Sequence, residues 1–138
     1  MLGEKIGEEH GKVTGRRVLP GNDERTFMKM EVSFETETIM YGVSGMNMGT
    51  YEMYERGPGQ LYGEGQGVIM TMEGDGVIWH GQGVGRMADE AGTMAFAAAL
   101  VCQTTSTKLA ALNGLLVLAE HTVDMQGNVK SAIYEWKA

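Results

Sequence analysis

The polar side chains with the greatest chemical potential lie in the middle of the chain, on one side of neighbouring expected strands. Glu64, His80 and Arg86 supply a carboxylate, an imidazole and a guanidinium, and the residues on the same side are Glu52, Tyr54, Tyr62, Gln66 and Gln82. Such a set could bind a polar substrate or transfer protons. It could equally form a solvated outer wall, with Glu64 directly across from Arg86 in one ion pair. We favour the outer wall, because apolar side chains occupy the opposite side.

Methionine is the second residue type that could do chemistry. The chain has 12 methionines, and three pairs have the spacing Met-x-Met: Met28/Met30, Met46/Met48 and Met70/Met72. Thioethers are soft ligands that suit Cu(I). The pairs are expected on different faces, however, and no set of histidines and cysteines accompanies them. We therefore interpret the methionines as adaptable core filler.

The three histidines and the one cysteine give no recognisable site. His10, His80 and His121 fall on three different expected strands without a His-x-His spacing, so they are interpreted as surface residues and no metal is expected. Cys102 lies in an apolar run and is interpreted as a buried, inert thiol. The chain has no nucleophile elbow, Walker motif or dinucleotide fingerprint, and no cofactor is expected.

Composition excludes several classes of protein. The net charge of this 138-residue chain is −7, and Arg16-Arg17 is the only adjacent basic pair, which argues against nucleic acid or an anionic membrane as a partner. The first ten residues lack the apolar run of a signal peptide, and the chain has no stretch of eighteen apolar residues. We expect a cytoplasmic protein in which residues 1–138 form a single β-barrel domain.

Alternation and turn signals divide the chain into eight strand-like segments. The clearest is about 26–41, in which Met28, Met30, Val32 and Phe34 share one face. A turn at Pro20-Gly21-Asn22-Asp23 is expected before it, and residues 43–49 are expected to form a loop or bulge. The segments are about 5–19, 26–41, 50–56, 60–72, 77–87, 93–103, 108–121 and 129–136.

The expected architecture is all-β: an eight-stranded antiparallel meander barrel, calycin-like in form. Short connections favour antiparallel neighbours, and closure removes exposed sheet edges. The alanine-rich segments 93–103 and 108–121 also have high helix propensity, so the alternative is an α+β fold with a C-terminal helical hairpin on a smaller sheet. Segments six and seven are apolar on both faces, and the outer face is expected to be covered by a second subunit, giving a homo-oligomer.

A repeated tetrapeptide occupies the fourth and fifth strands. Gly65-Gln66-Gly67-Val68 recurs as Gly81-Gln82-Gly83-Val84, with Gly74-Asp75-Gly76 between the copies. A three-residue loop at that point would place Gly67 opposite Gly83 and Gly65 opposite Gly85. The preceding hairpin would place Tyr51 opposite Gly65 and Met53 opposite Gly63. The resulting inner face holds six glycines beside Tyr51, Met53, Leu61, Ile69, Thr71 and Trp79.

Two explanations fit so many glycines in strands. Large rings could lie over them while the sheet coils tightly enough to close, or the glycines could leave room for a ligand. In the second case the candidate ligand-binding residues are Tyr51, Met53, Gly65, Gly67, Thr71, Trp79 and Gly83. Glu55 is among the few polar groups expected on the inner face, and it is the candidate for a catalytic carboxylate.

Several segments resemble a family of small bacterial proteins of unknown function whose fold is similar to the allene oxide cyclase barrel. They are Gly49-Thr50-Tyr51-Glu52, Gly65-Gln66-Gly67-Val68, residues 79–85, residues 108–114 and Glu135-Trp136-Lys137. The resemblance covers most of the chain beyond about residue 26. It implies an eight-stranded antiparallel barrel and an oligomer. It does not imply cyclase activity, and no active-site residue of the cyclase matches a motif here.

Three functional hypotheses follow. The first is a β-barrel that binds a small, largely apolar molecule in its lumen. The second is an enzyme of the isomerase or cyclase type that uses an inner carboxylate such as Glu55. The third is a barrel whose lumen is filled by its own side chains and whose function lies in its assembly.

Overall fold

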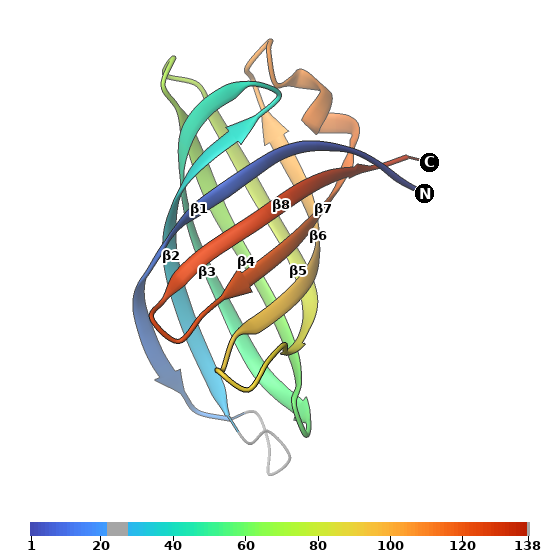
Figure 1. Ribbon diagram of the computed structural model, residues 1–138. Helices are drawn as coiled ribbons and strands as arrows, with labels where there is room; N and C mark the ends of the chain where they lie inside the picture. The colour runs from blue at the N-terminus through green and yellow to red at the C-terminus, as the bar shows by residue number, and fades with distance from the viewer. Residues whose placement is uncertain (22–27, 138) are drawn as a thin grey trace.

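The chain folds into a closed barrel of eight antiparallel strands in the computed structural model, which describes residues 1–21 and 28–137 (Figure 1). The strands are β1 (Leu2–Leu19), β2 (Lys29–Met40), β3 (Val43–Gly57), β4 (Gln60–Thr71), β5 (Gly76–Met87), β6 (Met94–Thr104), β7 (Leu116–Val123) and β8 (Asn128–Trp136). This confirms the predicted all-β, eight-stranded antiparallel barrel. Asn22 and Asp23 of the predicted turn, and the expected start of the second strand near residue 26, lie outside the described residues.

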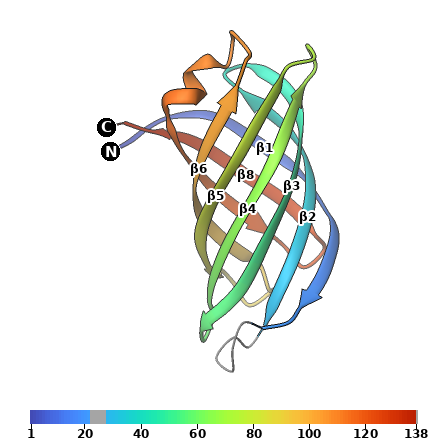
Figure 2. The same ribbon diagram turned by 180° about the vertical axis from the view of Figure 1, so that it is seen from behind.

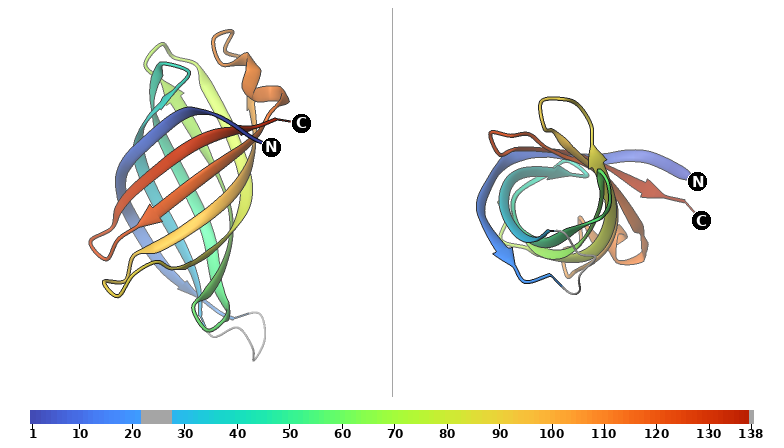
Figure 3. Two further views of the ribbon diagram at one scale, coloured as in Figure 1. Left: turned by 45° about the vertical axis from the view of Figure 1, so that its right-hand side comes forward. Right: turned by 90° about the horizontal axis from the view of Figure 1, so that it is seen from below.

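The barrel closes through pairing of its first and last strands. Each strand pairs with its successor, and β8 pairs with β1, for example with Glu9 opposite Ser131. Figure 3 shows the resulting ring of strands from below, with the two termini emerging side by side. The Met1 amino group donates a hydrogen bond to the carbonyl of Lys137 at 2.7 Å. Closure of this kind pairs both edges of the strands over most of the barrel. The end of β1 is the exception, because beyond Val13 it pairs with β2 but not with β8.

The connection between β2 and β3 is shorter than predicted. Residues 43–49 are strand rather than a loop or bulge, because Tyr41 and Gly42 alone make the turn. Their φ angles are 48° and 76°, the left-handed pair required by a two-residue type I′ hairpin. Asn47 is therefore part of a continuous strand and points into the barrel, where it is 4% exposed.

The C-terminal third forms strands, so the alternative of a helical hairpin is wrong. Alternating burial against the lumen outweighs the helix propensity of its alanines. Residues 108–115 are not strand, however, and include the 3₁₀-helix η1 (Ala110–Gly114). Leu109 and Leu112 are at most 2% exposed and join the apolar core at the end of the barrel where η1 lies (Figure 2). No helix among the described residues is long and apolar enough to cross a membrane.

The predicted register between β4 and β5 is wrong by four residues. Gly67 lies opposite Trp79, Gly65 opposite Gly81 and Gly63 opposite Gly83. The three-residue loop is made by residues 72–74 rather than 74–76, because Gly74, at φ 93°, is its left-handed residue. A shift by an even number leaves every side chain on its predicted face. The register of β3 on β4 is as predicted, with Tyr51 opposite Gly65.

Inward-facing side chains form two apolar clusters. The larger contains Leu109 and Leu112 together with Ile69, Val77 and Trp79, and the smaller consists of Met53, Leu61 and Phe96. Because Leu61 begins β4 and Ile69 lies near its end, the clusters occupy opposite ends of the barrel. The space between them is where the lumen is hollow.

Candidate functional site

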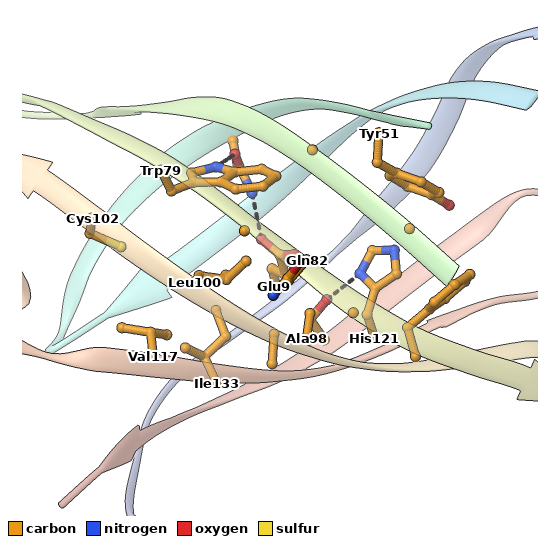
Figure 4. A pocket seen from close by; sticks show the side chains of 18 of the residues that line it. Glu9, Tyr51, Trp79, Gln82, Ala98, Leu100, Cys102, Val117, His121 and Ile133 are labelled. Atoms are coloured by element: carbon orange, nitrogen blue, oxygen red, sulfur yellow. Dashed lines mark hydrogen bonds between the residues drawn. The ribbon is translucent and has the colours of Figure 1, made fainter. Parts of the chain in front are cut away.

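A cavity of about 100 Å³ lies in the lumen and contacts both apolar clusters. Part of its wall carries almost no side chains, since it is formed by Gly63, Gly65, Gly81, Gly83 and Ala98. Leu100 and Cys102 also line the cavity and are only partly buried, although they point inward. Figure 4 shows these side chains with the polar residues of the same lumen.

Aromatic rings cover only part of the glycine-bearing wall. A Cβ atom on Gly67 would lie 2.4 Å from the indole of Trp79, and one on Gly85 would lie 2.5 Å from the ring of Phe96. At Gly63, by contrast, the nearest atom would be 3.4 Å away. The steric explanation therefore applies at Gly67 and Gly85. Of the glycines that line the cavity, Gly63 has room for a Cβ atom, whereas at Gly65, Gly81 and Gly83 a Cβ would lie 2.2–2.7 Å from a backbone oxygen of the neighbouring strand.

Glu9 is the buried carboxylate of the lumen. It is 8% exposed, lines the cavity, and accepts hydrogen bonds at Oε2 from the hydroxyls of Thr36 (2.9 Å) and Thr38 (3.1 Å) and from Nδ2 of Asn47 (2.9 Å). These three donors are uncharged. A buried carboxylate needs several hydrogen-bond donors of this kind, because the cost of removing it from water is otherwise unopposed.

Asn47 links this carboxylate to Trp79. Its Oδ1 accepts a hydrogen bond of 2.8 Å from the indole Nε1 of Trp79, while its Nδ2 donates to Glu9. The indole ring is thereby fixed against Gly67 and Gly49, and it forms one apolar surface of the cavity. The two hydrogen bonds of Asn47 therefore position the apolar indole ring of Trp79 and the ionisable carboxyl group of Glu9 in the wall of one cavity.

His121 and Tyr51 form the second polar group of the lumen. His121 Nδ1 lies 2.7 Å from Ser131 Oγ, and the imidazole packs among Phe34, Tyr51 and Phe96 with ring centroids 5.4–6.4 Å apart. Burial lowers the pKa of His121, an effect that the nearby Glu9 partly opposes. Burial also raises the pKa of Tyr51 to about 12. Both side chains are therefore uncharged at neutral pH.

The depressed pKa of His121 predicts a loss of stability in mild acid. Below the ordinary pKa of 6.5 the unfolded chain binds a proton at this histidine that the folded chain refuses. The contribution of the uncharged imidazole to the free energy of unfolding is complete above pH 6.5. It declines as the pH falls toward the lowered pKa of the folded state, by at most about 1.4 kcal/mol per pH unit. Urea unfolding at pH 7.5 and 5.0 should show a smaller decline for His121→Gln than for wild type. His10→Gln changes an exposed histidine, so its free energy of unfolding should decline as much as that of wild type. Equal declines for all three proteins would show that the buried His121 does not cause the loss of stability.

Cys102 faces the lumen, and none of the described residues activates its thiol. Burial raises the pKa of its thiol to about 11, so little thiolate exists at neutral pH. The thiolate is the reactive form of cysteine. These properties fit the predicted inert thiol.

The predicted ligand-binding residues separate into two groups. Tyr51, Gly65, Trp79 and Gly83 line the cavity. Those outside its lining are Met53 in the smaller apolar cluster, Gly67 beneath Trp79, and Thr71, whose Oγ1 accepts a hydrogen bond from the Asp75 amide in the β4–β5 turn.

The candidate catalytic carboxylate, Glu55, is placed away from the cavity. It lies near the end of β3, where its Oε1 accepts a hydrogen bond of 3.4 Å from the Gly59 amide. The inner carboxylate that lines the cavity is Glu9 instead.

The polar set on β3, β4 and β5 forms the outer wall, as favoured from the sequence. The predicted pair of Glu64 with Arg86 is wrong, because the four-residue register shift places Gln82 opposite Glu64 and Arg86 opposite Gln60. Outside the barrel, the Tyr62 hydroxyl donates to Gln82 at 3.0 Å, and His80 is exposed. The surface interpretation is wrong for His121, which is inside the lumen.

The interpretation of the methionines as core filler is wrong for two of the three Met-x-Met pairs. Met46, Met48, Met70 and Met72 are 41–84% exposed, because their positions in β3, β4 and the following turn point away from the lumen.

Sequence reasoning missed four polar residues of the lumen: Glu9, Asn47, His121 and Ser131. A signal for two of them was present. His121 alternates in phase with the buried Val117, Ala119 and Val123. Ser131 alternates in the same way with Val129 and Ile133. Alternation could thus have predicted that these two polar residues point inward. It could not have predicted that they contact the same cavity.

Comparison with known proteins identifies the fold. No family model matches the sequence, and no curated protein matches it. A protein of unknown function from Clostridium acetobutylicum has a similar structure, with a TM-score of 0.81 at 13% identity over 97% of this chain and 98% of that one. A conserved protein of unknown function from Rhodopseudomonas palustris gives 0.80 at 13% identity, covering 98% and 97%. A β-barrel-like protein from Acinetobacter baumannii gives 0.68 at 12% identity, covering 99% and 96%. The chain thus has the barrel fold of bacterial proteins of unknown function.

Proposed function

We propose that the protein binds a small, largely apolar molecule in the lumen of its barrel. The observation that carries this proposal is the cavity beside Gly63, Gly83 and Ala98, where inward-facing side chains keep partial exposure. Cavities of this kind, mostly apolar with a few convergent polar groups, are the usual form of small-molecule sites.

The size of the cavity limits the molecule. An apolar cavity of roughly 150 Å³ engineered in another protein binds benzene or xenon. The cavity here measures about 100 Å³. By that scale it accommodates about four non-hydrogen atoms, as a whole ligand or as the buried end of a longer one.

Xenon uptake tests this proposal, because xenon is apolar and makes no hydrogen bonds. We expect ¹²⁹Xe NMR to report a protein-bound environment in wild type that is lost in Ala98→Leu, whose added carbons fill the cavity. Ala97→Leu, on the adjacent outward-facing position, should keep the signal. A wild-type spectrum without bound xenon, or one unaffected by Ala98→Leu, would refute a hollow lumen.

An isomerase or cyclase that uses an inner carboxylate is the second candidate function. The observation in its favour is the position of Glu9, which lines the cavity and whose described hydrogen bonds are all to Oε2. A carboxylate in an apolar pocket is a common form of general base. This candidate rests on Glu9 rather than on Glu55.

We also propose that the protein is a homo-oligomer that covers an apolar band on the outside of β3, β4 and β5. Met46, Met48, Val68, Met70 and Ile78 are 36–58% exposed, and cross-strand pairing makes them neighbours. An exposed patch of this kind is typical of a contact between subunits.

Native mass spectrometry tests the oligomer. Wild type should give a multiple of the chain mass, and the double variant Ile78→Lys, Val68→Lys should give the mass of the monomer. A wild-type monomer would refute the oligomer.

A further inference from the structure

Two buried polar atoms of the lumen have no hydrogen-bond partner among the described residues. They are the hydroxyl oxygen of Tyr51 and the Nε2 atom of His121, and both residues line the cavity. Buried polar groups are nearly always paired, because an unpaired one keeps its full desolvation cost. Two unpaired atoms on adjacent side chains indicate that a partner from outside the chain belongs between them.

The surrounding residues hold these two side chains in place. The Tyr51 ring lies 6.0 Å from the rings of Phe34, Phe96 and His121, and its contact with the imidazole is edge-on at 89°. Ser131 fixes the opposite edge of the imidazole through Nδ1. Figure 4 shows the free nitrogen of His121 on the side toward Tyr51.

We propose that the molecule in the lumen carries an uncharged oxygen, as a carbonyl or hydroxyl group, that hydrogen-bonds to Tyr51 Oη and His121 Nε2. This inference rests on the proposed function and names the chemical class of the ligand. The Tyr51 hydroxyl supplies a donor. His121 Nε2 supplies a donor or an acceptor according to the direction of its bond with Ser131. A carbonyl oxygen fits two donors, and a hydroxyl fits one donor and one acceptor.

The remaining charges of the lumen argue for a neutral group. Glu9 lies close enough to act on His121 electrostatically, so an anionic ligand would meet a carboxylate. The Glu9 carboxylate already accepts three hydrogen bonds at Oε2. The apolar remainder of the cavity, which includes Phe34, Ile69 and Leu100, fits a short hydrocarbon portion.

A matched pair of compounds distinguishes this site from a plain apolar cavity. Acetone and isobutene have the same shape, with four non-hydrogen atoms each, and differ in a carbonyl against a carbon–carbon double bond. A cavity without hydrogen-bonding groups favours the hydrocarbon, because burying an unpaired carbonyl is unfavourable. The proposed site favours the ketone.

NMR titration of ¹⁵N-labelled protein in sealed tubes measures both dissociation constants. We expect the ketone to bind at least about tenfold more tightly than the hydrocarbon, from one well-made hydrogen bond or more. Tyr51→Phe should weaken ketone binding several-fold, leave hydrocarbon binding unchanged, and raise the melting temperature of the free protein, since it removes an unpaired hydroxyl. Tyr62→Phe, on the outer wall, should leave both affinities unchanged.

Each other outcome counts against the inference. If both compounds bind equally well, or if Tyr51→Phe does not alter ketone binding, the oxygen site is wrong and the proposed lumenal binding of an apolar molecule stands. If only the hydrocarbon binds, the oxygen site is likewise wrong and the proposed binding of an apolar molecule stands. If neither binds, the two polar atoms serve a bridging water, and the inference and the proposed function fail together.

Discussion

Replacing Gly67 by alanine is expected to destabilise the protein by about 3 kcal/mol. The new Cβ would lie 2.4 Å from two atoms of the Trp79 indole and 2.5 Å from its Nε1. The indole is held by its hydrogen bond to Asn47, so it can move aside only by breaking that bond. Overpacking of a core costs about 1–3 kcal/mol, and a lost buried hydrogen bond adds about 1–3 kcal/mol.

Urea unfolding followed by tryptophan fluorescence checks this result, because Trp79 is buried and its emission should move to longer wavelength in the variant. Gly15→Ala is the matched control: Gly15 also lies in a strand, and a Cβ there would have no atom within 4 Å. It should unfold at the wild-type urea concentration or above. A Gly67→Ala variant as stable as Gly15→Ala would contradict the packing of Trp79 against β4.

Replacing Glu9 by alanine is expected to cost about 3 kcal/mol or more. The change removes the acceptor of three hydrogen bonds and leaves the hydroxyls of Thr36 and Thr38 and the amide of Asn47 without it. Each unpaired buried group costs about 1–3 kcal/mol, and the cavity left by the side chain adds to this. Glu9→Gln keeps an acceptor oxygen of the same shape and should cost about 1 kcal/mol.

Urea unfolding of both variants, beside Glu8→Ala on the outer face, measures these differences. Glu8 is exposed and paired with Lys5, so its removal should leave stability unchanged. A stable Glu9→Ala would show that the carboxylate does not organise the lumen. Glu9→Gln also addresses the second candidate function, since a general base would exchange the α-deuterium of deuterated acetone with water. Exchange by wild type and not by Glu9→Gln would support an enzyme, and exchange by neither would argue against one.

Strand alternation was enough to predict the apolar side chains of β3, β4 and β5 that enter the lumen, because period two is set by the backbone itself. Met53, Leu61 and Trp79 were placed inside from parity alone, and all three are buried. The predicted faces were correct even where the predicted register of β4 on β5 was wrong, because the error was an even number of residues. The barrel followed from the number of strands and their short connections.

The polar cluster of the lumen was not predictable in the same way. Glu9 reaches its donors on β2 and β3, and His121 reaches Ser131 on β8. These contacts join residues up to 38 positions apart, so they depend on the tilt and closure of the whole barrel. Local pattern favoured Glu55 because it shares a face with Tyr51, but it lies near the end of β3, where the turn binds it. Parity predicts on which side of its strand a side chain lies. Its position along the barrel axis depends on the register of all the strands in three dimensions.

A crystal structure of the protein soaked with acetone tests the central claim, that the lumen is a binding site for a small molecule, most directly. We expect density for the ketone in the cavity beside Gly63 and Ala98, with its oxygen within hydrogen-bonding distance of Tyr51 Oη and His121 Nε2. Ketone bound only on the outer surface, with the lumen closed by the protein's own side chains, would contradict it.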